Sequence, residues 1–66
     1  MQIHVNGQDR TFDSPMTLTE LVADFQLDPR HVAVEVNEQL VPRFRHASTA
    51  IQDGDRIEIV TLVGGG

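Results

Sequence analysis

Hydrophobic and polar residues along this 66-residue chain repeat with two different periods. A period of two places alternate side chains on one face of a strand, whereas a period between three and four places them along one side of a helix. The pattern predicts strands at residues 1–5, 8–13, 31–37 and 56–63, a short edge strand within residues 38–42, and one helix at residues 17–27.

The first two predicted strands form a hairpin. Asn6 and Gly7 lie between them, and this dipeptide favours a type I′ turn because both of its residues readily adopt positive φ. Phe12 is the main apolar side chain of the returning strand. The strand ends at Ser14-Pro15, because proline cannot continue the hydrogen-bond ladder.

The predicted helix carries its own start and stop signals. Thr17 is a good N-cap, and Glu20 stands three residues later, which together form a capping box. We expect the helix to end at Asp28-Pro29. The stripe that faces the core consists of Leu18, Leu21, Val22 and Phe25.

The second half of the chain is read as three strands joined by turns. In the strand at 31–37 the inward residues are Val32, Val34 and Val36, and Ala33, Glu35 and Asn37 point outward. Residues 43–50 are predicted to be irregular or 3₁₀-helical, with Phe44 tucked inward. The last strand is apolar on both faces, which is typical of a strand in the middle of a sheet.

The element order β-β-α-β-β-β predicts an α+β protein with the β-grasp (ubiquitin-like) fold. It has a mixed sheet of four or five strands, one main helix, and a last strand parallel to the first. Residues 1–63 form the domain, and residues 64–66 are a flexible Gly-Gly-Gly tail. The predicted core comprises Ile3, Val5, Leu21, Val34, Val36, Ile57 and Ile59.

Composition narrows the function. The chain has no cysteine, so it has neither a disulfide nor a thiolate metal site. The net charge of −5, with five arginines and no lysine, disfavours a nucleic-acid partner. No signal peptide and no apolar run long enough to span a membrane are visible, so we expect a cytoplasmic protein.

Side chains that often carry chemistry are scattered. His4, His31 and His46 lack metal-ligand spacing, and we interpret them as solvated or half-packed imidazoles. Asp53–Asp55 is interpreted as a turn in which Gly54 supplies positive φ, not as a calcium loop. No nucleophile, base and orienting group form a catalytic set. We therefore expect no bound metal, no bound cofactor and no catalysis by the chain alone.

The glycine tail is the strongest candidate for chemistry. Three extended residues reach about 10 Å, and glycine has no Cβ to obstruct a narrow channel. Gly64 and Gly65 are expected to enter the active site of another protein, where Gly66 presents its carboxylate. Val60 and Leu62 point outward if Ile57 and Ile59 point inward, and such exposed apolar residues often mark a docking surface.

Three blocks of the sequence resemble the bacterial ThiS family: MQIHVNG, VAVEVNEQLVPR and IQDGDRIEIVTLVGGG. The resemblance implies a sulfur carrier of thiamine (thiazole) biosynthesis. An E1-like enzyme of the ThiF type would use ATP-Mg to adenylate the carboxylate of Gly66. A sulfur donor protein would convert the adenylate to a thiocarboxylate, and a ThiG-type thiazole synthase would receive the sulfur.

Three other functions fit the same tail or the same fold. A molybdopterin synthase small subunit and a ubiquitin-like modifier of lysines would use the same carboxylate chemistry. A plain interaction domain would carry an inert tail. A thiocarboxylate at the tail excludes the interaction domain, and the identity of the sulfur acceptor separates the others.

Overall fold

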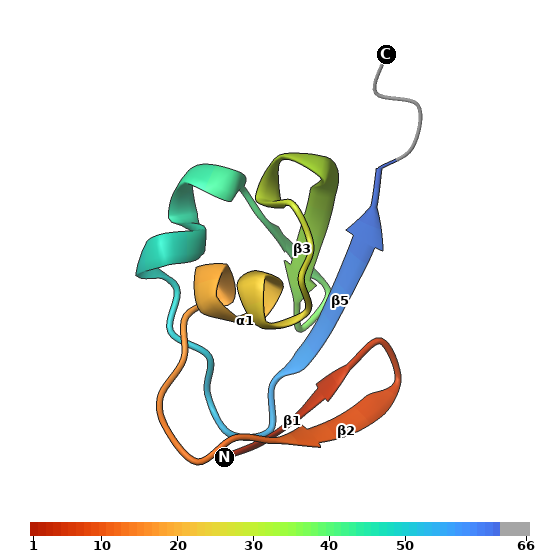
Figure 1. Cartoon of the computed structure of the whole chain (residues 1–66). Helices are drawn as coiled ribbons and strands as arrows, with labels where there is room; N and C mark the ends of the chain where they lie inside the picture. Colours follow the sequence, from red (N-terminus) through yellow and green to blue (C-terminus); the bar gives the residue numbers. More distant parts are fainter. Residues whose placement is uncertain (63–66) are drawn as a thin grey trace.

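The computed structural model describes residues 1–62, and it places five strands and one α-helix in a single layered arrangement (Figure 1). The elements in chain order are β1 (Gln2–Val5), β2 (Gln8–Thr11), α1 (Leu18–Asp24), η1 (Pro29–His31), β3 (Val32–Val36), β4 (Gln39–Val41), η2 (Arg43–Ser48) and β5 (Arg56–Thr61), where η denotes a 3₁₀-helix.

The sheet has the strand order β2-β1-β5-β3-β4, with the last strand at its centre. β5 runs parallel to β1 and antiparallel to β3. The predicted mixed sheet, the central position of the last strand and its direction relative to the first are therefore confirmed. This is the β-grasp arrangement, in which a hairpin and a crossover helix precede the strand that completes the sheet.

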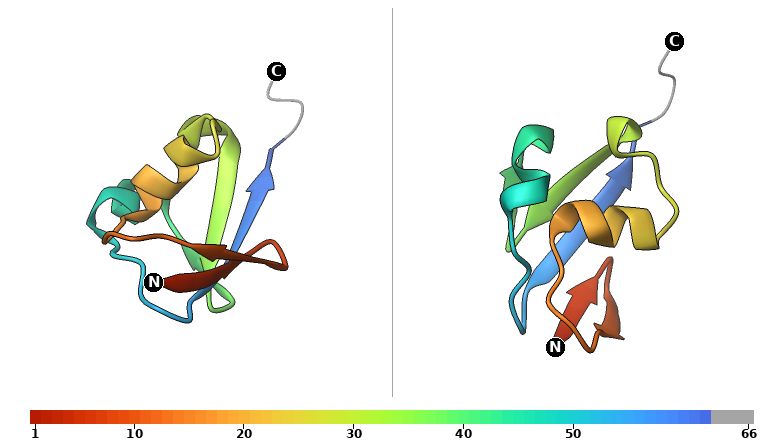
Figure 2. Two further views of the ribbon diagram at one scale, coloured as in Figure 1. Left: turned by 60° about the horizontal axis from the view of Figure 1, so that its bottom comes forward. Right: turned by 60° about the vertical axis from the view of Figure 1, so that its left-hand side comes forward.

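One face of the sheet packs against α1, and η2 lies on the same side (Figure 2). We call this the inner face. Six of the seven predicted core residues are buried there, and Val36 is half-buried. Sequence reasoning did not include Ile51, which is 6% exposed. Its backbone N–H donates to the carbonyl of Met16 at 2.9 Å, so a contact remote in sequence holds it inside.

The helix begins as predicted and ends earlier. The N–H of Glu20 donates to the hydroxyl of Thr17 at 3.2 Å, and the N–H of Thr17 donates to the carboxylate of Glu20 at 2.9 Å. The end expected at residues 28–29 is wrong, because the last helical residue is Asp24. Gln26 adopts φ 59°, and the N–H of Leu27 donates to the carbonyl of Val22 at 3.1 Å, which is a Schellman motif without glycine.

Two expectations for the segment after β4 are wrong. Phe44 is 81% exposed and does not tuck inward, and His46 is 3% exposed and is not a half-packed imidazole. The segment is the 3₁₀-helix η2, as one of the two predicted alternatives stated. With three residues per turn, the side chain two positions before an inward residue points away from the core. His46 therefore takes the inner position, with its Nε2 at 2.9 Å from the carbonyl of Val41.

The predicted turns are confirmed. Asn6 has φ 51° and Gly7 has φ 79°, as a type I′ turn requires. In the turn at 53–55, Gly54 has φ 86°. The carboxylate of Asp53 accepts from the backbone N–H of Gln2 at 2.7 Å, and that of Asp55 accepts from the backbone N–H of Gln52 at 2.8 Å. These bonds give the aspartates a structural role. Within residues 1–62, no histidine or acidic residues gather into a metal-binding cluster.

Candidate functional site: the end of the central strand and the outer face

The final described residue of the chain is held to the sheet by a backbone hydrogen bond. The N–H of Leu62 donates to the carbonyl of His31 at 2.7 Å, one residue beyond the end of β5. Figure 1 shows β5 directed away from the end of the sheet where the N-terminus lies. Residues 63–66 follow, so the predicted tail residues Gly64, Gly65 and Gly66, and the domain boundary after residue 63, lie outside the described residues.

The outward orientation expected for Val60 and Leu62 is confirmed, since both are 56% exposed. They lie on the face of the sheet opposite α1, which we call the outer face. Val60 pairs with Ala33 across β5 and β3. With Leu40, which is 66% exposed, they make up three of the four exposed large apolar side chains within residues 1–62. An exposed apolar surface thus leads to the point where the tail begins.

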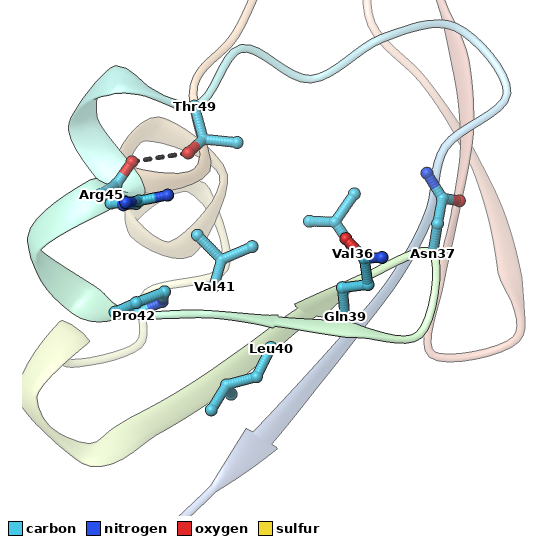
Figure 3. A pocket seen from close by; sticks show the side chains of 8 residues that line it. All are labelled: Val36, Asn37, Gln39, Leu40, Val41, Pro42, Arg45 and Thr49. Atoms are coloured by element: carbon cyan, nitrogen blue, oxygen red, sulfur yellow. Dashed lines mark hydrogen bonds between the residues drawn. The ribbon is translucent and has the colours of Figure 1, made fainter.

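Leu40 belongs to the outer face, although it also borders a groove. The groove, of about 420 Å³, lies between β4 and η2. Figure 3 shows Val36 and Val41 pointing into the space beside η2, whereas Leu40 points to the other side of β4. At the η2 side of the groove, the hydroxyl of Thr49 donates to the carbonyl of Arg45 at 2.6 Å. The groove is lined by residues of β3, β4 and η2 and lies away from the C-terminal end of β5. None of the predicted site residues lines it.

Asn6 and Asn37, both with positive φ, hold the two edges of β5. The sequence predicted only that Asn6 lies in a turn and that Asn37 points outward. The side chain of Asn6 accepts from the N–H of Ile59 at 2.7 Å and donates to its carbonyl at 3.1 Å. The last backbone hydrogen bond on the β1 side is to Ile57, so these two side-chain bonds extend the β1 side of the ladder along β5 from Ile57 to Ile59. Asn-Gly turns are the only sequence signal for this contact.

Asn37 performs the corresponding role on the β3 side. Its side-chain oxygen accepts from the N–H of Arg56 at 3.0 Å, and its side-chain nitrogen donates to the carboxylate of Asp55 at 3.0 Å. Its backbone N–H donates to the carbonyl of Arg56 at 2.7 Å. The start of β5 is thus fixed from the β3 side, while its middle is fixed from the β1 side by Asn6.

The short helix η1 supports the anchor of Leu62. Asp28 caps η1 by accepting from the N–H of Arg30 at 2.9 Å, and the guanidinium of Arg30 donates to the same carboxylate at 2.8 and 3.1 Å. These hydrogen bonds hold the pKa of Asp28 well below its usual range, with a smaller contribution from the positive charge of Arg30. The cap fixes the turn whose last residue, His31, receives the N–H of Leu62.

The fold and this surface define a small ubiquitin-like β-grasp protein whose central strand leads into three C-terminal glycines. The family comparison agrees with that class. The model of the ThiS family matches residues 3–66, and this chain belongs to the ThiS family.

Individual relatives support the assignment. The sulfur carrier protein ThiS of Escherichia coli is 38% identical over 68 residues, and the match covers all of both chains. The thiazole synthase of Paramagnetospirillum magneticum is 42% identical over 66 residues, which are all of this chain and 20% of that protein. This chain therefore spans about a fifth of the length of that relative.

A solved structure has the same fold over the whole chain. The crystal structure of the thiamine biosynthesis protein ThiS from Geobacter metallireducens matches with a TM-score of 0.85 and 32% sequence identity, and the match covers 100% of both chains. No helix within residues 1–62 is long and apolar enough to cross a membrane. The cytoplasmic location stays a prediction.

Proposed function

We propose that this chain is a sulfur carrier of thiamine biosynthesis that carries sulfur on the carboxylate of Gly66. The observation that carries the proposal is the family match, which extends through the three glycines to residue 66. The relatives named as ThiS sulfur carriers and thiazole synthase favour this role over a role in molybdenum cofactor synthesis.

The proposed cycle begins with activation, because a carboxylate is a poor electrophile. A carboxylate oxygen of Gly66 attacks the α-phosphate of ATP-Mg in an E1-like enzyme, and pyrophosphate leaves. The outer sulfur of a persulfide on a donor protein then attacks the acyl carbon, and AMP departs with that oxygen. A thiol attacks the donor-side sulfur of the resulting acyl disulfide, which forms a new disulfide on the donor and releases the thiocarboxylate. The resulting thiocarboxylate stays ionised at neutral pH and is a nucleophile. In this scheme the nucleotide and the metal belong to the activating enzyme.

Thiazole synthase is the proposed sulfur acceptor. A relative with that name contains a region 42% identical to this whole chain, which supports a physical association between the two functions. Val60 and Leu62 are proposed to dock the partner, since they are exposed and adjacent to residues 63–66. Gly64 and Gly65 are proposed to pass through the entrance of the partner's active site.

The carrier is proposed to act as a co-substrate and not as a catalyst. Asn6 and Asn37 bind the backbone of β5, and Asp55 accepts from Asn37 and from the N–H of Gln52, so these polar side chains have structural partners. Activation and transfer would therefore depend on groups that the partners supply. In this proposal the reacting group of the chain is the carboxylate of Gly66.

The experiment is an adenylation assay with ATP and the cognate activating enzyme, using two tail variants. Deletion of Gly66 moves the carboxylate back by about 3.5 Å, which is severe because reacting atoms must approach to about 3–3.5 Å. Gly65→Val adds a branched side chain where backbone alone is expected to pass. Both variants should lose adenylation, whereas Gly64→Ala, nearer the entrance, should lose less.

Melting curves of the same variants provide the control. The core described within residues 1–62 already joins the helix to the sheet, so we expect the midpoints not to change. Normal adenylation of both Gly65→Val and the deletion would contradict the carrier function. A lowered melting midpoint would show instead that the glycines stabilise the fold.

A further inference from the structure

Two glutamates face each other at the centre of the outer face. Glu35 on β3 and Glu58 on β5 are direct partners in the antiparallel register, and both are exposed. Directly opposed residues on one face have Cβ atoms about 4.5–5.5 Å apart, and like charges in this position destabilise a sheet. The free protein therefore carries an unfavourable pair of charges in the middle of its sheet.

No ion pair within residues 1–62 includes either glutamate. The ion pairs of the described chain join His4 with Asp9 and join Asp28 with Arg30 and His31. Arg56 lies two positions before Glu58 on the same strand but forms no ion pair with it. Both carboxylates are also without a hydrogen-bond donor from residues 1–62, so water satisfies them in the free protein.

Apolar side chains lie beside the glutamates toward β4 and toward the end of β5, whereas His4 and Arg56 border the same hollow as Glu58 on the β1 side. Leu40 pairs with Glu35 from the β4 side, and the next pair along the strands is Ala33 with Val60. A protein that covered Val60 would also remove water from the two carboxylates. Burying an unpaired carboxylate costs several kcal/mol, so a cation that the partner places between the two carboxylates would stabilise the docked state.

We propose that the outer face binds a basic, apolar-rimmed surface of thiazole synthase, with an arginine placed between Glu35 and Glu58. A guanidinium fits this position better than an ammonium group, because its planar set of five donors can reach both carboxylates. The partner arginine would remove the repulsion that the free carrier retains. The inference rests on the docking role proposed for Val60 and Leu62, and it adds the chemistry of the partner surface.

The test is titration of the cognate thiazole synthase with the Glu35→Gln/Glu58→Gln double variant, at low and at high salt. The variant should bind at least about tenfold more weakly at low salt, since charge pairs at interfaces are sensitive to loss of one partner. Its affinity should also depend less on salt. The same substitutions should raise the melting midpoint by about 1–4 °C, because they relieve the repulsion.

Asp13→Asn/Asp24→Asn is the matched control. It makes the same change in net charge at two exposed positions, one in the loop after β2 and one on α1. It should leave the affinity within about twofold of the original. The inference is supported if only the Glu35→Gln/Glu58→Gln variant binds more weakly and melts at a higher temperature. If the two glutamates only stabilised the fold, their replacement would lower both the affinity and the melting midpoint.

Two results would overturn the inference. One is an unchanged affinity of the Glu35→Gln/Glu58→Gln variant, and the other is an equal loss in the control variant. The sulfur-carrier function is judged separately, by whether the original protein acquires a thiocarboxylate. If Val60→Ala/Leu62→Ala weakens binding while the glutamate variant does not, the outer face still docks and only its proposed charge recognition fails.

Discussion

The two faces of β5 differ in what surrounds them, although their residues alternate along the same six-residue strand. Ile57 and Ile59 point toward α1 and are 0% and 6% exposed. Glu58 and Val60 point the other way and are exposed. Because successive side chains of a strand lie on opposite faces, neighbouring residues in the sequence have entirely different surroundings.

This difference separates stability from docking. The inner residues hold the sheet to the helix, and the outer residues leave a mixed apolar and acidic surface beside the start of the tail. Substitutions on the inner face should therefore destabilise the protein, while substitutions on the outer face should change mainly what it binds and should not destabilise it.

Ile59→Ala should destabilise the fold by about 2–5 kcal/mol, because it removes a buried side chain and leaves a cavity. That is a large part of the stability of a small domain, which is on the order of 5–15 kcal/mol. Urea denaturation measures the change. A midpoint equal to that of the original protein would contradict the inward position of Ile59.

Asn6→Gly should cost about 1–3 kcal/mol, since it leaves the backbone groups of Ile59 without their side-chain partner. Glycine keeps the positive φ of the turn at little cost, so the variant isolates the lost hydrogen bonds. Asn37→Gly is the matched variant on the β3 side of the strand. Amide exchange should increase at Ile59 in the first variant and at Arg56 in the second. The reverse pattern would refute the assignment of Asn6 and Asn37 to the two edges of β5.

Val60→Ala/Leu62→Ala should weaken association with thiazole synthase by about tenfold, while stability stays within about 0.5 kcal/mol of the original. Phe44→Ala is the control, because Phe44 is 81% exposed but lies on η2, on the side of the sheet that carries α1. Titration calorimetry with each variant provides the measurement. Equal losses for Phe44→Ala and the double variant would mean that the outer face has no special part in docking.

Asp28→Asn should have the smallest effect, a faster amide exchange at Leu62 with no change at Ile59. The substitution removes the carboxylate that caps η1 and binds Arg30. Because the pKa of Asp28 is lowered in the folded protein, its contribution is present above the usual carboxyl range and is lost as the pH falls below it. Acidification of the original protein should therefore lower the protection factor of the Leu62 amide, which corrects for the intrinsic exchange rate at each pH. No change in protection at Leu62 in either experiment would contradict this support.

Local patterns were sufficient to predict most of the fold. The capping box of Thr17 and Glu20, the turn at Asn6 and the alternation of Ile57 and Ile59 each depend on residues close in sequence. The outward position of Val60 followed from the same alternation. These signals are strong because a single short-range geometry, a cap, a turn or a pleat, determines them.

The features that sequence reasoning missed depend on contacts between distant segments. The choice of His46 over Phe44 as the buried residue depends on the carbonyl of Val41 and on the turn of η2. Ile51 is buried because its segment pairs with the chain before α1. The opposition of Glu35 and Glu58 requires the β3–β5 register, which the sequence of either strand alone does not define.

The most direct test of the sulfur-carrier function is the intact mass of the protein purified from its native cell. The account predicts a fraction of molecules in which one oxygen has been replaced by sulfur, with the added mass on the C-terminal peptide that contains Gly66. The fraction should disappear when Gly66 is deleted. A protein with only its unmodified mass, from cells that are actively making thiamine, would contradict the account.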